Sequence, residues 1–369
     1  MEEIKRNIDA ETLREWLEEK ENVIVVDVRP QEQRDEWYIP GSKYVDAYKG
    51  LSKGDSSILD DLEIPENTKV VAVCAAGRTS QIASDVLRKR GIDSYSLEGG
   101  MKSWSLAWNT AELNFGELTI LQIRRTGKGC LSYIIASKGE AIVIDASINA
   151  AVYIEIAKKR NWKVKYVVDT HMHADHLSRA LVLAKQTDTS IYLPENDNLQ
   201  FDYNKIIDED QIAFGTSYLK AIHTPGHTLD STCYLVDEKY LFTGDTIFID
   251  GVGRPDLKAN EEQAKVRASL LYDSLHKILK LKNDTFIFPG HISKPIPFDD
   301  KPIAGKLGDI QEEVSSLKLS KEHFVANILA KIPPTPLNYL RVSEINAIGN
   351  FEGIDPKELE AGANRCAIP

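Results

Sequence analysis

Apolar and polar residues alternate with two different periods along the first 110 residues. Residues 10–20 show the helical period and follow Asp9, a residue type that caps helix N-termini, so we expect a helix there. A second helical stretch, residues 80–90, precedes Gly91, which favours a helix end. The predicted strands are residues 23–28, 69–75 and 92–97. Because strands alternate with helices, this part predicts a compact α/β domain with a largely parallel sheet.

From about Asn114 onward, short apolar runs separated by glycine-containing turns predict strands in quick succession. These strands are residues 118–124, 131–137, 141–145, 164–169, 191–193, 218–223, 232–236, 240–243 and 286–289. Two helical stretches, residues 151–160 and 177–186, lie among them, so we expect a second, larger α/β domain.

The chain after residue 289 predicts a mostly helical tail. It is interrupted at Pro333-Pro334-Thr335-Pro336, because proline cannot continue a helix. With a boundary near residues 110–116, we place the two domains at residues 1–110 and 114–369.

Composition narrows the class of protein. The length of 369 residues suits two domains, and 42% hydrophobic with 27% charged residues is typical of a globular chain. The net charge of −11 disfavours partners such as nucleic acid or an anionic membrane. The acidic start is followed by no apolar signal segment, and no apolar run is long enough to span a bilayer, so we expect a cytoplasmic protein.

Cys74 lies where a predicted buried strand gives way to a helix. The small residues Ala75, Ala76 and Gly77 let the backbone N–H groups turn toward the sulfur. The helix N-terminus and Arg78 favour the thiolate, which is the reactive form of cysteine. A phosphatase built on such a loop would need Arg six positions after the cysteine, where this chain has Ser80, so sulfur chemistry is favoured. The alternative is that Cys74 is a small packing residue at a strand end.

Several motifs around this cysteine resemble a single rhodanese domain covering residues 1 to about 110. They are Asp27-Val28-Arg29, Ile39-Pro40-Gly41, the loop of residues 74–79, and Leu97-Glu98-Gly99-Gly100 with Trp104. The resemblance implies that Cys74 accepts and donates sulfane sulfur, supported by the loop amides and Arg78, with structural roles for Asp27 and Arg29. Two positions depart from the family: Tyr38 replaces a frequent His, and Arg78 comes one position early. These departures affect the expected sulfur donor more than the transfer chemistry.

Six of the eight histidines lie in three short segments that each follow a predicted strand. The segments are His171-Met172-His173-Ala174-Asp175-His176, His223-Thr224-Pro225-Gly226-His227, and His291. Asp245 follows a further strand, and side chains at strand ends can converge at one edge of a sheet. Imidazole and carboxylate donors without thiolate indicate catalytic zinc, iron or manganese. We expect His223, His276 and His323 to lie outside this site, and Cys130, Cys233 and Cys366 to be packing residues.

Residues 116 to 291 resemble the metallo-β-lactamase fold, an αββα sandwich with metals at the sheet edges. The segments of residues 129–133, 141–145, 244–245 and 251–256 look most like the persulfide dioxygenases, which are similar to glyoxalase II but bind one iron. The tail from Lys306 onward resembles that group more loosely. The resemblance implies His171, His227 and Asp245 as ligands of one Fe(II) per chain. His173, Asp175, His176 and His291 would surround them as hydrogen-bonding groups, and Arg254 would bind the anionic end of the substrate.

These sites together predict a fused sulfurtransferase and persulfide dioxygenase. Its iron would use O2 to oxidise a thiol persulfide, such as glutathione persulfide, to sulfite and thiol, and Cys74 would exchange sulfane sulfur with thiosulfate or persulfide. The alternative enzyme is a glyoxalase II-like thioester hydrolase with two zinc ions. His171, His173 and His227 would hold the first zinc, Asp175, His176 and His291 the second, and Asp245 would bridge them. A third hypothesis is that the protein is a non-enzymatic sulfur carrier. Proteins of this fold often self-associate, so we expect a homo-oligomer.

Overall fold

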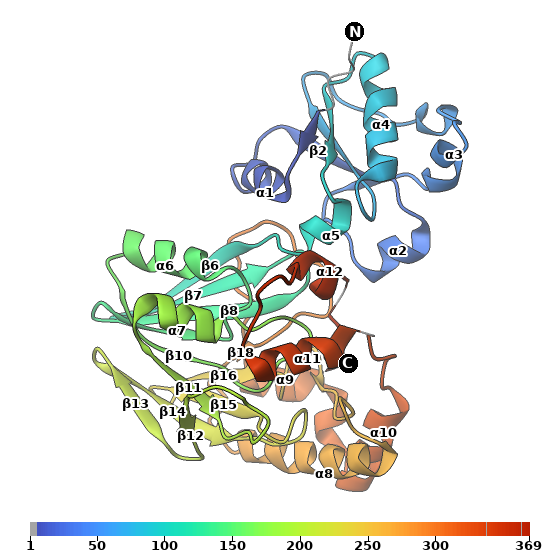
Figure 1. Ribbon diagram of the computed structural model, residues 1–369. Coiled ribbons are helices and arrows are strands. Elements are labelled where there is room, and N and C mark those ends of the chain that lie inside the picture. The colour runs from blue at the N-terminus through green and yellow to red at the C-terminus, as the bar shows by residue number, and fades with distance from the viewer. Residues whose placement is uncertain (1–5, 337, 363) are drawn as a thin grey trace.

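The computed structural model describes residues 6–336, 338–362 and 364–369, which form two α/β units (Figure 1). The N-terminal unit contains a five-stranded parallel sheet with the order β1-β5-β4-β2-β3. Its strands are β1 (Asn7–Ile8), β2 (Val23–Asp27), β3 (Lys43–Tyr44), β4 (Lys69–Val73) and β5 (Ser94–Leu97). The parallel sheet expected for this part is thereby confirmed.

Helices cover both faces of this sheet. They are α1 (Ala10–Glu18), α2 (Gln31–Glu36), α3 (Tyr48–Ser52), α4 (Arg78–Lys89) and α5 (Gly100–Trp104), with a short 3-10 turn at Ser57–Leu59. The Asp9 side chain accepts a hydrogen bond from the Thr12 amide at the start of α1, as predicted. Gly91 has a φ of 83° just after α4, a left-handed conformation that glycine adopts without strain. The short elements α2, α3 and β3 were not predicted, because they carry too few residues to show a period.

The C-terminal unit contains two larger sheets. The first has the order β12-β11-β10-β9-β8-β7-β6 and the second β13-β14-β15-β16-β18-β19. The strands of the first sheet are β6 (Asn109–Phe115), β7 (Leu118–Arg125), β8 (Cys130–Ser137), β9 (Glu140–Ile144), β10 (Lys163–Val168), β11 (Ser190–Pro194) and β12 (Asn204–Ile206). Those of the second are β13 (Gln211–Phe214), β14 (Ser217–His223), β15 (Thr232–Val236), β16 (Tyr240–Gly244), β18 (Phe286–Pro289) and β19 (Gly305–Lys306).

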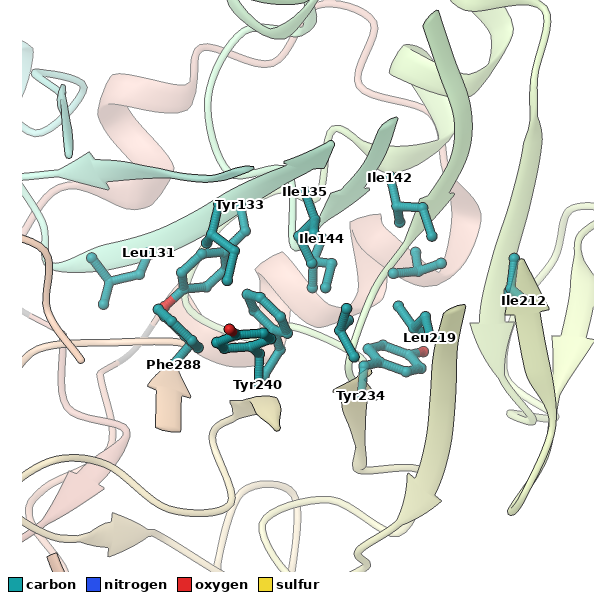
Figure 2. Close-up of a cluster of buried hydrophobic side chains, with 14 of the residues drawn as sticks. Leu131, Tyr133, Ile135, Ile142, Ile144, Ile212, Leu219, Tyr234, Tyr240 and Phe288 are labelled. Atoms are coloured by element: carbon teal, nitrogen blue, oxygen red, sulfur yellow. The ribbon is translucent and has the colours of Figure 1, made fainter. Parts of the chain in front are cut away.

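The two sheets face each other across one apolar core, seen in Figure 2, where Tyr133 and Ile144 of the first sheet lie opposite Tyr234 and Phe288 of the second. The outer face of the first sheet packs against α6 (Ala150–Lys159) and α7 (Ala180–Thr187). The outer face of the second packs against α8 (Glu261–Ile278), α9 (Leu307–Glu313) and α10 (Lys321–Ala330). The layers are therefore helix, sheet, sheet, helix, the arrangement expected from the sequence. The predicted helix at residues 177–186 begins later, at Ala180. The residues before Ala180 continue the loop that carries the histidines of residues 171–176, called the histidine-rich loop below.

The helical tail continues after β19 and returns toward the N-terminal unit. It comprises α9, a 3-10 turn (Ser315–Lys318), α10, α11 (Asn338–Ile348) and α12 (Pro356–Glu360). The described residues between α10 and α11 form no helix, in line with the prolines there. The chain then forms β20 (Ala367–Ile368), which pairs with β17 (Val252–Gly253). No helix among the described residues is both long and apolar enough to cross a membrane.

The tail and the N-terminal unit are in contact. In Figure 1, α12 lies directly beside α5, and the Lys102 ammonium of α5 is 2.6 Å from Glu358 of α12. The Trp37 indole N–H donates to the carbonyl of Thr126, and the Arg365 guanidinium donates to Glu36. The interface thus joins the N-terminal unit to the same tail that reaches the histidine-rich loop.

Candidate metal centre and cysteine loop

Cys74 follows β4 directly, and the loop after it turns toward its sulfur. The Gly77 amide donates to Cys74 Sγ at 3.1 Å, and Ser80 Oγ lies 3.4 Å from the same sulfur. Gly77 has a φ of 88°, and a Cβ on it would lie 2.9 Å from the Gly99 amide nitrogen. Only glycine therefore fits this tight turn. The loop presents a backbone donor to the sulfur, as the sequence predicts.

The Gly99-Gly100 turn closes over the cysteine loop from the other side. The Met101 amide donates to the Cys74 carbonyl at 2.8 Å, and the Lys102 amide donates to the Ala75 carbonyl. Arg78 is the exposed first residue of α4, and among the described residues its side chain makes no hydrogen bond to the sulfur. Asp27 and Arg29 form a buried ion pair at 2.7 Å beneath the loop.

Three side chains from the ends of different strands meet in the C-terminal unit. His171 follows β10, His227 follows β14, and Asp245 follows β16. The Nε2 atoms of His171 and His227 lie 3.9 Å and 3.4 Å from Asp245 Oδ2. All three side chains are buried, and Asp245 Oδ2 has no hydrogen-bond partner among the described residues. A buried carboxylate oxygen without a partner is costly, so this group fits a bound cation.

Hydrogen bonds fix the orientation of both imidazoles. His171 Nδ1 lies 2.9 Å from Thr170 Oγ1, which itself donates to Asp145. His227 Nδ1 donates to the Arg254 carbonyl at 2.8 Å. With Nδ1 carrying the proton, each ring presents the lone pair of Nε2 toward Asp245, which is the arrangement that metal-binding histidines need.

The His173 ring lies beside that of His171, with ring centroids 4.3 Å apart, but its Nε2 atom has another partner. Its Nε2 is 3.2 Å from Asp145 Oδ1, and it clusters with Asp145 and Asp169 rather than with His171 and His227. In this arrangement Nε2 of His173 pairs with Asp145, whereas Nε2 of His171 and of His227 lies near Asp245.

Asp175, His176 and His291 form a neighbouring cluster. His291 lies between two carboxylates, with Nδ1 2.5 Å from Asp245 and Nε2 2.9 Å from Asp175. His176 Nδ1 is 3.1 Å from Asp175 Oδ1. The Cys130 thiol donates to Asp175 Oδ2 at 3.2 Å and belongs to the same cluster. Cys130 is buried, as expected of a packing residue, and its thiol also contacts the site because β8 begins there.

Burial and charge set the protonation of these groups. Burial alone would raise the pKa of Asp245, but His291, His227 and His171 outweigh it and hold the pKa well below its ordinary value. Burial alone would lower the pKa of His291, yet the carboxylates of Asp245 and Asp175 raise it well above the ordinary value. Burial and the nearby His173 lower the pKa of His171. The site thus combines an anionic Asp245 and a protonated His291 with a neutral His171.

Two glycines allow the backbone to come close to Asp245. A Cβ on Gly253 would lie 1.9 Å from the Asp245 carbonyl, and one on Gly290 would lie 2.7 Å from Asp245 Oδ1. A larger residue at position 253 would displace the backbone of Asp245, and one at position 290 would displace its carboxylate.

The C-terminal tail supplies groups that were not predicted from the sequence to belong to the site. Cys366 packs in a buried apolar cluster with Tyr339, as expected, and its thiol also lies within 4.8 Å of ligand atoms of Asp245 and His291. Asn364 Nδ2 donates to Asp175 Oδ2 at 2.9 Å. Asn346 Nδ2 donates to the carbonyls of His173 and His176. No local spacing reveals these residues, because the tail reaches the site only through tertiary packing.

Glu360 anchors the tail beneath the histidine-rich loop. Its carboxylate accepts from the Leu177 amide at 3.0 Å and pairs with Arg125 at 2.6 Å and Arg179 at 3.1 Å. Glu360 and Arg125 are completely buried. An ion pair this deep holds its partners firmly, since removing either one leaves an unpaired buried charge.

Arg254 differs from its expected role. Its guanidinium is fully buried and donates to Asp256, to the carbonyls of Pro333 and Arg365, and to Thr335 Oγ1. Every nitrogen is thus used by the protein, so the side chain does not face the centre as a substrate-binding group. Its backbone carbonyl instead holds His227. His223 lies exposed at the end of β14, outside the clusters described above, as expected.

Residues 9–107 match the family of rhodanese-like domains, and residues 125–291 match the metallo-beta-lactamase superfamily. The chain has a rhodanese-like domain followed by a metallo-β-lactamase domain. This confirms the expected fold class, including the helical C-terminal region that follows the metallo-β-lactamase domain.

Solved structures resemble the metallo-β-lactamase domain. A metallo-beta-lactamase from Staphylococcus aureus subsp. aureus COL gives a TM-score of 0.58 at 25% identity, covering 64% of this chain and 74% of that one. ETHE1 from Myxococcus xanthus gives a TM-score of 0.53 at 22% identity, covering 65% of this chain and 98% of that one. At 22% identity, the similarity to ETHE1 shows a shared fold and nothing about activity.

Curated relatives carry the name hydroxyacylglutathione hydrolase. The protein from Rhizobium etli is 34% identical over 156 residues, which are 42% of this chain and 57% of the relative. The protein from Francisella philomiragia is 34% identical over 161 residues, 43% of this chain and 61% of the relative. This chain thus spans about three fifths of the length of these relatives.

Proposed function

We propose that the metallo-β-lactamase domain is an iron-dependent persulfide dioxygenase that works together with sulfur transfer at Cys74. The observation that carries the proposal is the convergence of His171 Nε2, His227 Nε2 and Asp245 Oδ2, while Nε2 of the neighbouring His173 pairs with Asp145. Two imidazoles and one carboxylate are typical of non-haem Fe(II) oxygenases, which keep adjacent coordination positions open. The substrate would be a thiol persulfide, such as glutathione persulfide, and the products sulfite and the thiol.

The residues of this chain would prepare the site for one Fe(II). That ion supplies the redox chemistry that dioxygen requires. Asp245 provides the negative charge, while Thr170 and the Arg254 carbonyl hold the two imidazoles with Nε2 free. His291 keeps a proton between Asp245 and Asp175 and thereby fixes the carboxylate that faces the ion.

The rhodanese-like domain would exchange sulfane sulfur with the same pool of substrates. In the exchange with thiosulfate, the Cys74 thiolate attacks the outer sulfur, the S–S bond of thiosulfate breaks, and sulfite leaves while a persulfide forms on Cys74. The Gly77 amide already donates to this sulfur and would stabilise its negative charge. Both proposed reactions would then involve persulfide and sulfite, which would explain why the two domains are joined in one chain.

The first test is oxygen consumption by anaerobically purified, iron-loaded protein after addition of glutathione persulfide, with sulfite measured in the same sample. We expect uptake with sulfite formation, and its loss in His171→Ala with loss of bound iron. Cys74→Ser should abolish sulfur transfer from thiosulfate and leave oxygen uptake intact. Absence of uptake from fully iron-loaded protein would contradict the proposal.

The second candidate is a thioester hydrolase with two zinc ions. The names of the curated relatives favour it, and so does the cluster of Asp175, His176 and His291 beside Asp245. Metal analysis separates the two, because one iron per chain and two zinc ions per chain are different results. His173→Ala should retain the single iron of the proposed dioxygenase, whereas it would remove a ligand of the first zinc of a hydrolase.

A further inference from the structure

A small cavity lies directly behind the histidine-rich loop. It has a volume of about 30 Å³ and is lined on one side by His171 and Met172. A single water molecule needs about 10–15 Å³ by such a measure, so the space holds a diatomic molecule. The cavity therefore reaches the proposed iron ligand His171 from inside the domain.

Apolar side chains form most of its wall. They come from α7, β11, the segment after β11 and the chain after α11, and include Leu181, Ile191, Leu193, Phe201 and Phe351. Gly349 completes the wall, and a Cβ there would lie 2.6 Å from Phe201 and 2.8 Å from Leu181. Most of the wall is thus apolar, and apolar cavities bind xenon and other apolar molecules.

One end of the cavity is polar. Asp169 Oδ1 and His173 Nδ1 are buried there without a hydrogen-bond partner among the described residues. Ser178, Asp230 and Asn346 also line the cavity, so ordered water can bind at its polar part, while the aliphatic and aromatic part of the wall offers water no hydrogen bond. The apolar part is left for a ligand that makes no hydrogen bonds.

A larger and more polar cavity borders the same loop. It has a volume of about 300 Å³, and its charged lining residues are Glu195, Asp197, Asp230, Lys258 and Arg267. A persulfide of the size of glutathione persulfide is too large for the small cavity, whereas the larger cavity has room for it. The two reactants of the proposed dioxygenase would therefore occupy separate spaces.

We propose that the apolar cavity of Leu181, Ile191, Leu193, Phe201 and Phe351 binds dioxygen and delivers it to the metal centre beside His171. This inference rests on the proposed function, because only an oxygen-consuming reaction needs such a site. Dioxygen is small, uncharged and apolar, which matches the volume and the wall of the cavity.

The first arm of the test uses xenon, which probes apolar cavities without any reaction. Crystals of the full chain without metal are pressurised with xenon, and we expect a xenon peak among Leu181, Ile191 and Phe201. Leu181→Phe adds a ring that fills the cavity and should remove the xenon peak. If Leu181→Phe does not fold, Ala180→Val, at another residue that lines the cavity, replaces it in the experiment. A cavity filled along its length by ordered water, without xenon, would overturn the inference.

The second arm measures the KM for dioxygen and for persulfide separately with iron-loaded protein. In Leu181→Phe we expect the KM for dioxygen to rise several-fold while the KM for persulfide stays unchanged. Val182→Phe adds the same ring on the same helix but faces an open surface hollow, so it should change neither. If a variant no longer binds xenon in the cavity but has an unchanged KM for dioxygen, the inference is overturned.

The outcomes also separate this inference from the proposed function. Oxygen uptake by a wild-type protein that binds no xenon would refute the cavity and leave the dioxygenase standing. Absence of uptake by fully iron-loaded wild-type protein would refute the dioxygenase, and the oxygen-binding role of the cavity with it.

Discussion

Asn364 donates a hydrogen bond from Nδ2 to Asp175 Oδ2 at 2.9 Å, although 189 positions of the chain separate the two residues. Asp175 accepts from His291 through the same oxygen, and His291 in turn contacts Asp245. A side chain of the tail thus acts on the proposed metal ligand Asp245 through two intermediate groups.

We expect Asn364→Ala to lower the affinity for iron by about 10- to 100-fold, the usual effect of removing a group that orients ligands from behind. Asp175 would lose one of its donors and let His291 move. The measurement is competition for iron with a chelator of known affinity. Asn350→Ala, at an exposed asparagine after α11, is the matched control. Equal affinities in the two variants would show that the hydrogen bond does not support the site.

Gly290→Ala should remove the metal while the protein stays folded. The added methyl group would lie 2.7 Å from Asp245 Oδ1 and 3.0 Å from the Gly244 backbone, so the carboxylate must shift. Iron content per chain and the circular dichroism spectrum would be measured together. Gly305→Ala provides the control, since its methyl group would meet only flexible isoleucine side chains at 3.3 Å or more. Full iron content in Gly290→Ala would mean that the close approach is not needed.

Glu360→Ala should lower the free energy of unfolding by about 3–5 kcal/mol, because Arg125 would remain buried without its partner. Denaturant unfolding of metal-free protein would measure this. Glu358→Ala, two residues earlier on α12, removes only the exposed pair with Lys102 and should cost at most about 1 kcal/mol. Similar losses in both variants would argue against a special role for the buried pair.

The stability contributed by Glu360 should depend on pH. Burial alone would raise the pKa of this carboxyl, but Arg125 and Arg179 outweigh it and lower the pKa below its ordinary value of 4.5. A lowered pKa in the folded state means that the stabilisation is present above pH 4.5 and is lost as pH falls further through the folded pKa. The difference in unfolding free energy between the wild type and Glu360→Gln should therefore shrink below that pH. A difference that stays constant down to the acid unfolding transition would refute the assignment.

Much of the fold was predictable because its signals are local. Apolar runs and helical periods predicted both α/β domains. Strands β15 and β18 have the bounds expected from the sequence. The convergence of the histidine segments with Asp245 was predictable for the same reason, because each follows a strand within a few residues, whereas the choice of His171, His227 and Asp245 as ligands came from the family resemblance.

The surroundings of the site were not predictable from spacing. Asn346, Glu360, Asn364 and Cys366 reach the centre only because the tail folds back across the domain. Arg254 looked like a substrate-binding residue because a sequence does not show which carbonyls and carboxylates occupy a guanidinium. Partners of this kind depend on the packing of segments that are far apart in the chain.

The order in which a ribosome makes this protein has a consequence for metal loading. The histidine-rich loop at residues 171–176 leaves the ribosome long before Asn346, Glu360 and Asn364, which hold it in place. Until those residues emerge, the histidines lack their supports and would bind whichever divalent ion is abundant, with little geometric selection. Correct metal insertion should therefore wait until the tail has left the ribosome and folded against the loop, so that tail folding commits the newly made protein to its metal.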